Sequence, residues 1–503
     1  MLLLLLVLLT PFVLRRALNA APAVTQTTNG DELVIATPHS PDIRREFARA
    51  FSAWHVEHYG SPVTLDFRAM AGTSDIKRIL QTNYDSVRLP DHTLPPEDQI
   101  ASTINIQIAW GGGNLFFDTE LKQLGILDQL HLSPAQIQDV FPRADLAGVD
   151  LYDREKDGIP RWVGVCLSSF GIMYNPDMYR QLGLDPPQTW SDLTNPKLID
   201  NLGLTDPTHS GSVMVCYMMV LQRAMADAET EFLKTHAKSD AGYDAAISAG
   251  FSRGMATLLL IAANGRYFTD SSNQTPLDVS DGQAAAAVTI DFYARIYGEQ
   301  VGGDRAKFVT PVNATAITPD PVAILYGTAG RKRELADHFV EFLLSPAGQR
   351  LWILKAGAPG GPIDRSLRRP PIRFSVYAED KSNWADPEVN PFKEAGSFNL
   401  RGAWMAFSQD IRPIWAAAWI DDRDALLDAY SHILAVHDDS RRQTLLDELS
   451  HLPVTLDDVR ADGVTRKTME SSTNGDQWKA QHRIDWASKF QEFYNRIGAE
   501  AHD

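Results

Sequence analysis

The stretch that decides the fold is Val165-Cys166-Leu167-Ser168-Ser169-Phe170-Gly171-Ile172-Met173-Tyr174-Asn175. It has the length and apolar character of a buried strand, yet two serines lie at its centre. A buried hydroxyl costs free energy unless it faces a wet cavity or bonds to the backbone. Ser168 and Ser169 therefore predict that this strand runs past a polar cavity, and both are candidate ligand-binding residues.

The sequence on both sides repeats a strand, a turn of small polar residues and a helix, which is the unit of an α/β sheet. A strand over 32–37 breaks at Pro38, and the helix expected over 42–58 carries Ile43, Phe47 and Phe51 at helical spacing. Further strands are expected at 63–67, 104–110, 163–174, 202–204, 284–290 and 307–310. Further helices are expected at 76–81, 213–233, 240–263, 333–344 and 345–355.

Three turns lie where a predicted strand ends and a helix begins: Thr37-Pro38-His39-Ser40, Gly72-Thr73-Ser74 and His209-Ser210-Gly211-Ser212. The start of a helix presents unpaired N–H groups and a partial positive charge, so it binds anionic or polar ligands without Lys or Arg. Ser and Thr are also ordinary N-cap residues, so each turn taken singly is better explained by capping. Their recurrence in both halves of the chain favours a shared cleft.

Several motifs, taken in order, resemble those of the solute-binding proteins of ABC importers with the type 2 periplasmic-binding fold. The serine-containing strand and the Tyr174-Asn175 that ends it are similar to the family's crossover strand. The other matching motifs are Pro187-Gln188-Thr189-Trp190-Ser191-Asp192-Leu193, the 206–212 loop, the 279–286 approach to a strand, and the helix 339–349. The resemblance covers about 33–360.

This resemblance implies an α/β fold of two Rossmann-like lobes joined by crossover strands. Lobe 1 would comprise 30–164 and 311–362, and lobe 2 would comprise 165–310. Residues 363–503 have a different residue pattern from the rest of the chain and are expected to form a largely helical C-terminal extension. By the same resemblance the protein is a monomer that closes its lobes on a small ligand and delivers it to the membrane subunits of an ABC importer.

The cleft implied by the resemblance and by the turns has a defined set of candidate residues. These are Thr37, His39, Ser40, Gly72, Thr73, Ser74, Trp110, Gly112, Ser168, Ser169, Ser210, Gly211, Ser212, Asp291 and Tyr293. Trp110 either stacks against the ligand or belongs to the lobe core. Asp270-Ser271-Ser272 either lines the second lobe's side of the cleft or caps a loop.

The identity of the ligand stays open at this stage between several chemistries. Within the family, iron binders carry two adjacent tyrosines, but this chain has Asp291-Phe292-Tyr293, so Phe replaces the first tyrosine. If the ligand is ferric iron, His39 and Tyr293 are its expected protein ligands. The neutral N–H and O–H donors of the other candidates suit a phosphate, phosphonate or sugar phosphate. Polyamine, thiamine-like and sugar ligands are the remaining alternatives.

Composition and the chain start restrict the class of partner and the location. A formal net charge of −17 over 503 residues argues against nucleic acid, which is bound through clustered Lys and Arg. The apolar run Met1–Leu14 is short for a membrane span, so 1–24 is expected to be an export signal or an uncleaved membrane anchor. The expected location is periplasmic or otherwise extracytoplasmic.

Catalytic and cofactor signatures are missing from the sequence. It contains no GxSxG, HExxH or GxxxxGK[ST] motif, and no GxGxxG after a strand, so neither an enzyme nor a resident cofactor is expected. Two alternatives stay open: a hydrolase using His39 or His209 with Ser212, and a structural role for the extension. Cys166 and Cys216 are either buried free thiols or one disulfide.

Overall fold

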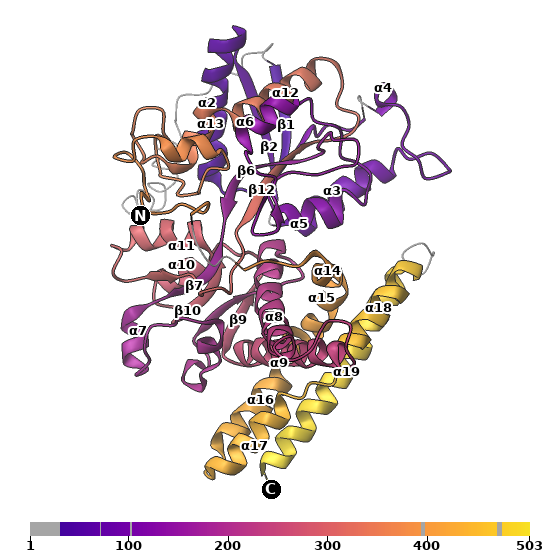
Figure 1. Cartoon of the computed structure of the whole chain (residues 1–503), viewed down its shortest axis with the longest axis vertical. Helices are drawn as coiled ribbons and strands as arrows, with labels where there is room; N and C mark the ends of the chain where they lie inside the picture. Colours follow the sequence, from indigo (N-terminus) through magenta and orange to yellow (C-terminus); the bar gives the residue numbers. More distant parts are fainter. Residues whose placement is uncertain (1–30, 71, 101–102, 394–397, 470–474, 503) are drawn as a thin grey trace, which may run out of the picture.

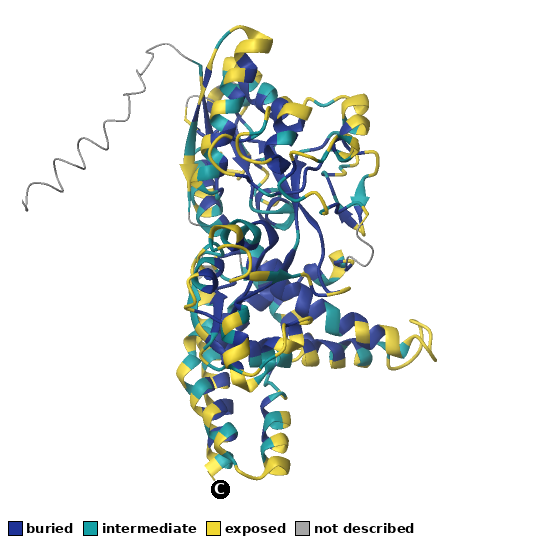
Figure 2. Ribbon diagram, turned by 90° about the vertical axis from the view of Figure 1, so that its left-hand side faces the viewer, coloured by how far each residue is buried: buried dark blue, intermediate teal, exposed yellow. Residues whose placement is uncertain are grey.

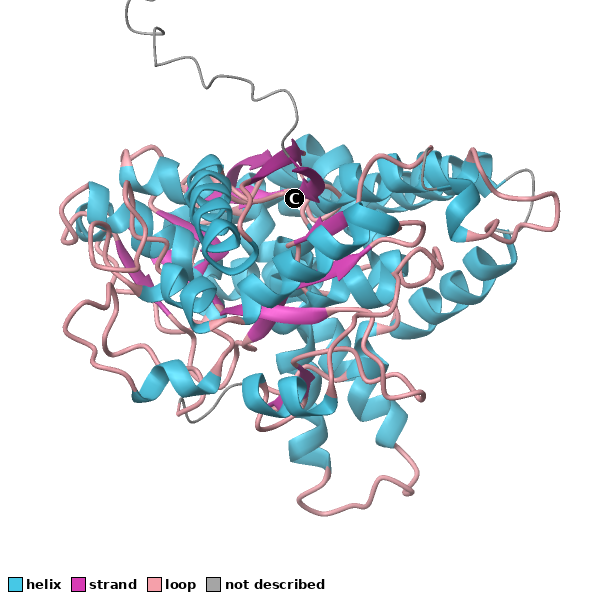
Figure 3. Ribbon diagram, turned by 90° about the horizontal axis from the view of Figure 1, so that it is seen from above, coloured by secondary structure: helices cyan, strands magenta, loops and turns pink. Residues whose placement is uncertain are grey.

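Two five-stranded sheets, one in each lobe, organise the chain (Figure 1). The computed structural model describes residues 31–70, 72–100, 103–393, 398–469 and 475–502. The predicted export segment 1–24 lies outside the described residues. Viewed from above, helices cover the strands on both sides (Figure 3), which is the layering of an α/β fold.

The first sheet has the strand order β2-β1-β3-β12-β6. Its strands are β1 (Asp31–Thr37), β2 (Val63–Ala69), β3 (Ile108–Trp110), β6 (Val163–Ser168) and β12 (Thr318–Ile324). Its main helices are α2 (Pro41–Tyr59), α3 (Thr73–Asp85), α12 (Gly330–Leu344) and α13 (Pro346–Ile353). β1 pairs in parallel with β2 and β3, and its residues 33–37 are all buried, as expected of a strand covered on both faces.

The second sheet has the order β11-β7-β10-β8-β9. Its strands are β7 (Phe170–Tyr174), β8 (Leu202–Thr205), β9 (Gly265–Thr269), β10 (Ala286–Ile290) and β11 (Lys307–Val309). The helices around it are α8 (Gly211–Phe232), α9 (Tyr243–Ala263), α10 (Gln274–Ser280) and α11 (Asp291–Gln300). Buried residues run through both sheets, while exposed residues cover the outer helices (Figure 2).

The predicted single strand 163–174 is two strands, one in each sheet. β6 ends at Ser168 in the first sheet, and β7 begins at Phe170 in the second. The chain returns between the sheets just before β12, whose first residue Thr318 pairs with Ser168. The two crossings therefore lie side by side between the lobes, which confirms the predicted type 2 periplasmic-binding fold.

The region after α13 begins irregularly and ends as a group of helices, as predicted. Its helices are α14 (Gly402–Met405), α15 (Ser408–Ala416), η5 (Ala417–Asp421), α16 (Arg423–Ala435), α17 (Asp439–Leu449), α18 (Leu456–Met469) and α19 (Gly475–His502). The extension is anchored on lobe 2, since the Trp415 indole contacts the Met255 sulfur at 3.1 Å and Arg423 donates to the Gly265 carbonyl at 2.6 Å. α16, α17 and α19 continue away from both lobes as a stalk (Figure 1).

Two further features of the core follow from burial. Among the described residues, α9 is long and apolar enough to cross a membrane, but half of its apolar window is buried, with Phe251 and Leu259 fully covered. That burial is what a core helix shows. Cys166 and Cys216 are both free and buried, and burial raises the pKa of each thiol well above its usual value.

Candidate functional site

A cavity of about 260 Å³ lies between the two lobes, where the strand ends and helix starts of both sheets meet. This size is near the lower end of small-molecule sites, which span ~300–1,000 Å³. The predicted residues that line it are His39, Ser40, Gly72, Thr73, Gly112, Ser168, Ser210, Gly211, Ser212 and Tyr293. Asp270, Ser271 and Ser272 line it as well, from the second lobe.

The remaining predicted residues do not line the cavity. Trp110 has no exposed surface and packs edge-on against the His39 ring, 4.3 Å between centroids, so it belongs to the lobe core. The buried Asp291 carboxylate accepts from Arg295 at 2.7 Å and from the Phe292 N–H at 2.8 Å, so it faces its own helix.

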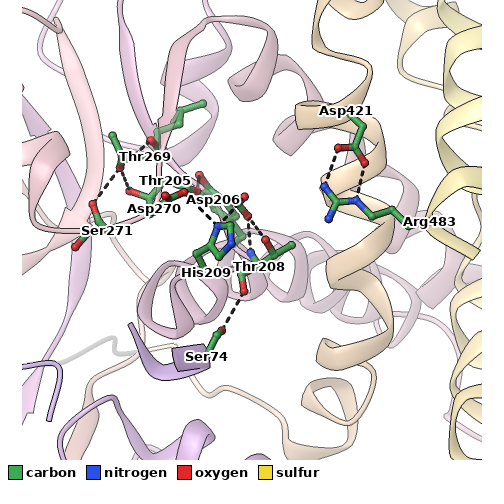
Figure 4. Close-up of polar contacts among 12 residues, drawn as sticks. Ser74, Thr205, Asp206, Thr208, His209, Thr269, Asp270, Ser271, Asp421 and Arg483 are labelled. Carbon is green, nitrogen blue, oxygen red and sulfur yellow. Dashed lines mark hydrogen bonds and ion pairs between the residues drawn. The ribbon is translucent and has the colours of Figure 1, made fainter. Parts of the chain in front are cut away.

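Three predicted residues support the cavity from behind or beside it. Thr37 is buried and lies against His39, with 3.0 Å between its Oγ1 and the Nδ1 of the imidazole. Ser169 lies between β6 and β7, and its carbonyl accepts from the Asp291 N–H at 3.0 Å. The Ser74 hydroxyl donates to the Thr208 carbonyl at 3.1 Å, which ties lobe 1 to lobe 2 (Figure 4).

The floor of the cavity is a network of charged side chains that the sequence did not reveal. Arg369 donates from Nη1 to Asp320 Oδ2 at 2.6 Å and from Nη2 to Ser168 Oγ at 2.7 Å. The other Asp320 oxygen accepts from the N–H groups of Gly112 and Gly113 at 2.8 and 3.0 Å. Burial opposes ionisation of Asp320, but the charge of Arg369 and these hydrogen bonds hold its pKa well below the usual range.

His39 is held in one orientation by partners on both ring nitrogens. Its Nε2 lies 2.9 Å from Asp320 Oδ2, and the Thr37 hydroxyl, which already accepts from the His39 N–H, faces Nδ1. These contacts assign the Nε2–H tautomer. Burial lowers the pKa of the imidazole, and the hydrogen bond to Asp320 opposes that effect without overcoming it.

Arg44 is the unpaired cation of the cavity wall. It extends from α2, forms no ion pair within the described part of the chain, and its buried Nε has no hydrogen-bond partner there. The Thr73 hydroxyl is likewise buried without a partner. Neither α2 nor α3 has a side-chain cap on its first N–H groups. The cavity therefore presents a guanidinium, a hydroxyl and helix N–H groups that lack a protein acceptor.

Two glycines bring the lobes into contact beside the cavity. A Cβ on Gly72 would lie 2.6 Å from the His209 carbonyl oxygen, and a Cβ on Gly211 would lie 2.6 Å from Thr73 Oγ1. Real Cβ atoms do not approach other atoms so closely, so only glycine fits at these points. The lobes meet in a closed arrangement.

At the edge of the cavity the His209 imidazole lies between two carboxylates (Figure 4). Its Nδ1 is 3.2 Å from both Asp206 and Asp270, and one ligand atom from each of the three residues lies within 4.8 Å of the others. The side chains of His209 and Asp270 are largely exposed. In the described part of the chain, neither His39 nor His209 is hydrogen-bonded to Ser212.

The sequence gives only weak signals for Arg369, Arg44 and Asp320, the cavity residues that were not predicted. Arg369 follows the segment that resembles the family, inside the region assigned to the extension. It reaches the cleft because the backbone at Pro370 and Pro371 pairs with β6, where Leu167 donates to the Pro370 carbonyl at 2.8 Å. Arg44 lies in the first turn of the predicted helix 42–58, and Asp320 lies between the predicted strand 307–310 and the predicted helix 333–344. An isolated charge at either place is typical of any surface.

The comparisons with known proteins agree with this geometry. Residues 122–384 match the family described as bacterial extracellular solute-binding protein. The phosphoglycerate transport regulatory protein PgtC of Salmonella typhimurium is 24% identical over 323 residues, which is 64% of this chain and 63% of that protein. The chain thus matches less than two thirds of the length of this relative.

Solved structures resemble the chain at low sequence identity. The periplasmic binding protein P5PA has a TM-score of 0.51 at 17% identity, covering 77% of this chain and 99% of that one. The periplasmic binding protein AfuA from Actinobacillus pleuropneumoniae, solved with fructose-6-phosphate, has a TM-score of 0.48 at 18% identity, covering 80% and 97%. With more than half of its length matched by the family model and with a polar cavity between its two lobes, the chain belongs to the bacterial extracellular solute-binding proteins.

Proposed function

We propose that this protein captures a small phosphate-bearing organic anion between its lobes and delivers it unchanged to the membrane subunits of an ABC importer. The observation that carries the proposal is Arg44, a cavity-lining guanidinium with no protein counter-charge within the described residues. A phosphoryl group supplies the negative charge and the acceptor oxygens that Arg44 and the uncapped starts of α2 and α3 lack.

The charged residues of the floor do not oppose an anion. Asp320 carries a charge but is neutralised by Arg369, and its lone pairs are occupied by Gly112, Gly113 and His39. Asp270 is at the rim, where its side chain is 79% exposed and water screens its charge. The name of the Salmonella relative, a phosphoglycerate transport regulatory protein, supports the same ligand class.

Ferric iron fits the donor set less well. Both nitrogens of His39 already have partners, so the imidazole is not free to coordinate a metal. Burial raises the pKa of Tyr293 to about 12, which makes the deprotonation that iron ligation requires more costly than for an exposed tyrosine. Phe292 stands where a second tyrosine would be needed, and its ring instead covers the Arg369 guanidinium at 4.4 Å.

Thermal-shift and calorimetric titrations of the purified mature chain test the proposal. The ligand series is 3-phosphoglycerate, fructose-6-phosphate, methylphosphonate, ferric citrate, spermidine and glucose. We expect the melting temperature to rise with a phosphorylated compound by mass action on the folded state, and the other classes to have no comparable effect. Elemental analysis of the protein as purified should find no stoichiometric iron.

Two results would overturn the proposal. Tight binding of ferric citrate together with tyrosinate colour would assign the cavity to iron. Hydrolysis of a phosphorylated compound that is lost in Ser212→Ala would make the protein an enzyme and not a carrier.

A further inference from the structure

A second cavity, of about 430 Å³, lies where the C-terminal extension meets lobe 1. Its wall comes from α3, from the π-helical turn η1 (Phe117–Leu121), from the 206–210 loop of lobe 2, and from α15, α18 and α19. It is separate from the interlobe cavity, because no residue lines both. Nothing in the proposed carrier function requires it.

Cations outnumber carboxylates in this wall, although the whole chain carries a net charge of −17. The lining cations are Lys77, Arg412, Arg466, Lys479 and Arg483, and the lining carboxylates are Asp410 and Asp462. Some of these charges are satisfied within the protein. Arg483 forms a two-pronged pair with Asp421 at 2.6 and 2.7 Å (Figure 4), and Arg466 pairs with Asp410 at 2.5 Å.

Arg412 is a buried cation of this wall that shares its carboxylate partner with another cation. Its side chain is 10% exposed, and its Nη2 lies 3.4 Å from Oε1 of the buried Glu120. That one carboxylate also faces Lys77 at 3.5 Å and accepts from Gln409 at 3.1 Å. The Nε of Arg412 has no hydrogen-bond partner in the described part of the chain.

Because Glu120 compensates the Arg412 charge only weakly, a further negative partner would stabilise this buried guanidinium. Burial lowers the pKa of Arg412, and the attraction of Glu120 does not offset this. A buried donor without an acceptor is destabilising, and more so when it is charged. A bound anion would recover that free energy.

We propose that this second cavity binds a small polyvalent anion, carrying two or more carboxylate or phosphate groups, between Arg412 of the extension and Lys77 of lobe 1. The stacked rings of Trp478 and His482, 4.7 Å between centroids, also line this cavity. The site is distinct from the transport cavity in position and in residues.

Binding there is coupled to closure of the lobes. Lys77 and Glu120 belong to lobe 1, whereas α15, which carries Arg412, packs on lobe 2 through Trp415. An anion that bridges Lys77 and Arg412 has both partners in place only when the lobes are closed. It therefore raises the affinity of the interlobe cavity for its own ligand, and the effect is reciprocal.

Calorimetry with inorganic pyrophosphate as the probe tests the proposal on the full mature chain. Arg412→Gln and Lys77→Gln remove the proposed ligands, Arg44→Gln weakens the interlobe cavity, and Lys197→Gln is an exposed lysine control. We expect pyrophosphate to bind the Lys197→Gln protein, in which an exposed lysine is replaced, like the wild type, and at least tenfold more weakly to Arg412→Gln and Lys77→Gln. In Arg44→Gln any pyrophosphate binding by the interlobe cavity is weakened, and the binding that remains is that of the second cavity.

The Lys77 side chain is 36% exposed, so Lys77→Gln remains informative even if Arg412→Gln fails to fold. Unchanged pyrophosphate affinity in Lys77→Gln, or loss of binding in Arg44→Gln alone, would overturn the second site. The proposed transport function is measured separately, by titration of Lys77→Gln with the phosphorylated ligand series. That titration should still show binding, with reduced enhancement by pyrophosphate.

Discussion

Arg369 and Asp320 form an ion pair beneath the interlobe cavity, with Nη1 and Oδ2 2.6 Å apart and side chains 3% and 9% exposed. The pair joins the first residues of β12 to a segment 49 residues further along the chain. Each partner also has a neighbour in the cavity wall, Ser168 for Arg369 and His39 for Asp320. The pair therefore fixes the floor on which any ligand would rest.

Breaking this pair should destabilise the protein strongly. Arg369→Gln leaves Asp320 buried without its counter-charge, so we expect the free energy of unfolding to fall by about 3–5 kcal/mol. The matched control is Arg350→Gln, whose partner Glu379 is one-third exposed, and it should cost no more than about 1 kcal/mol. Urea unfolding followed by circular dichroism measures both. If the free energy of unfolding fell equally in the two variants, the Arg369–Asp320 pair would contribute no more to stability than a partly exposed ion pair.

Stability should decline on mild acidification because of His39. Burial lowers the pKa of His39 in the folded protein, while in the unfolded chain it has its ordinary value of about 6.5. As the pH falls through about 6.5, His39 binds a proton in the unfolded chain but stays neutral in the folded protein. The free energy of unfolding therefore decreases, by up to ~1.4 kcal/mol per pH unit for one proton.

The comparison that isolates this effect is wild type against His39→Gln, unfolded in urea between pH 8 and pH 5. The difference in their free energies of unfolding should shrink as the pH falls, and parallel curves would contradict the prediction. Asp320 affects the stability of the protein in a lower pH range. Its depressed pKa gives stability that is present above about pH 4 and is lost as the pH falls further.

Removing the unpaired charge of the cavity wall should weaken ligand binding without harming the fold. We expect Arg44→Gln to raise the Kd for the phosphorylated ligand about 10- to 100-fold, because a hydrogen bond to a charged group contributes about 1.5–3 kcal/mol. Arg45→Gln is the control, since this neighbour points to solvent and pairs with Asp42 and Asp364. Isothermal calorimetry on both variants decides the question, and an unchanged Kd for Arg44→Gln would remove Arg44 from the site.

A methyl group at the interlobe contact should hinder closure. In Gly72→Ala the new Cβ would lie 2.6 Å from the His209 carbonyl in the closed arrangement, whereas separated lobes would accommodate it. We expect the Kd to rise at least tenfold, about 1.4 kcal/mol, with little change in the melting temperature of the ligand-free protein. Small-angle scattering with ligand should then show a larger radius of gyration than for the wild type. Gly402→Ala, where a Cβ meets no atom within 4 Å, is the control and should bind normally.

Much of the architecture could be predicted from local patterns. The α/β class, the boundaries of α2 and α8, and the crossover at Ser168 follow from apolar periodicity, from small polar turns and from serines placed inside an apolar run. The position of the cavity follows as well, because strand ends and helix starts in such sheets meet at a shared edge. These signals lie within a few residues of one another, so the sequence alone carries them.

The charges of the cavity could not be predicted in the same way. Asp291 looked like a ligand residue but turns to Arg295, and Trp110 is covered by its own lobe. Arg369 enters the floor from a segment that runs beside β6, and Arg412 is buried against Glu120 from a distant helix. The role of a charged side chain depends on which opposite charge or unpaired donor lies within a few ångströms of it. Only the packing of segments far apart in the chain determines that distance.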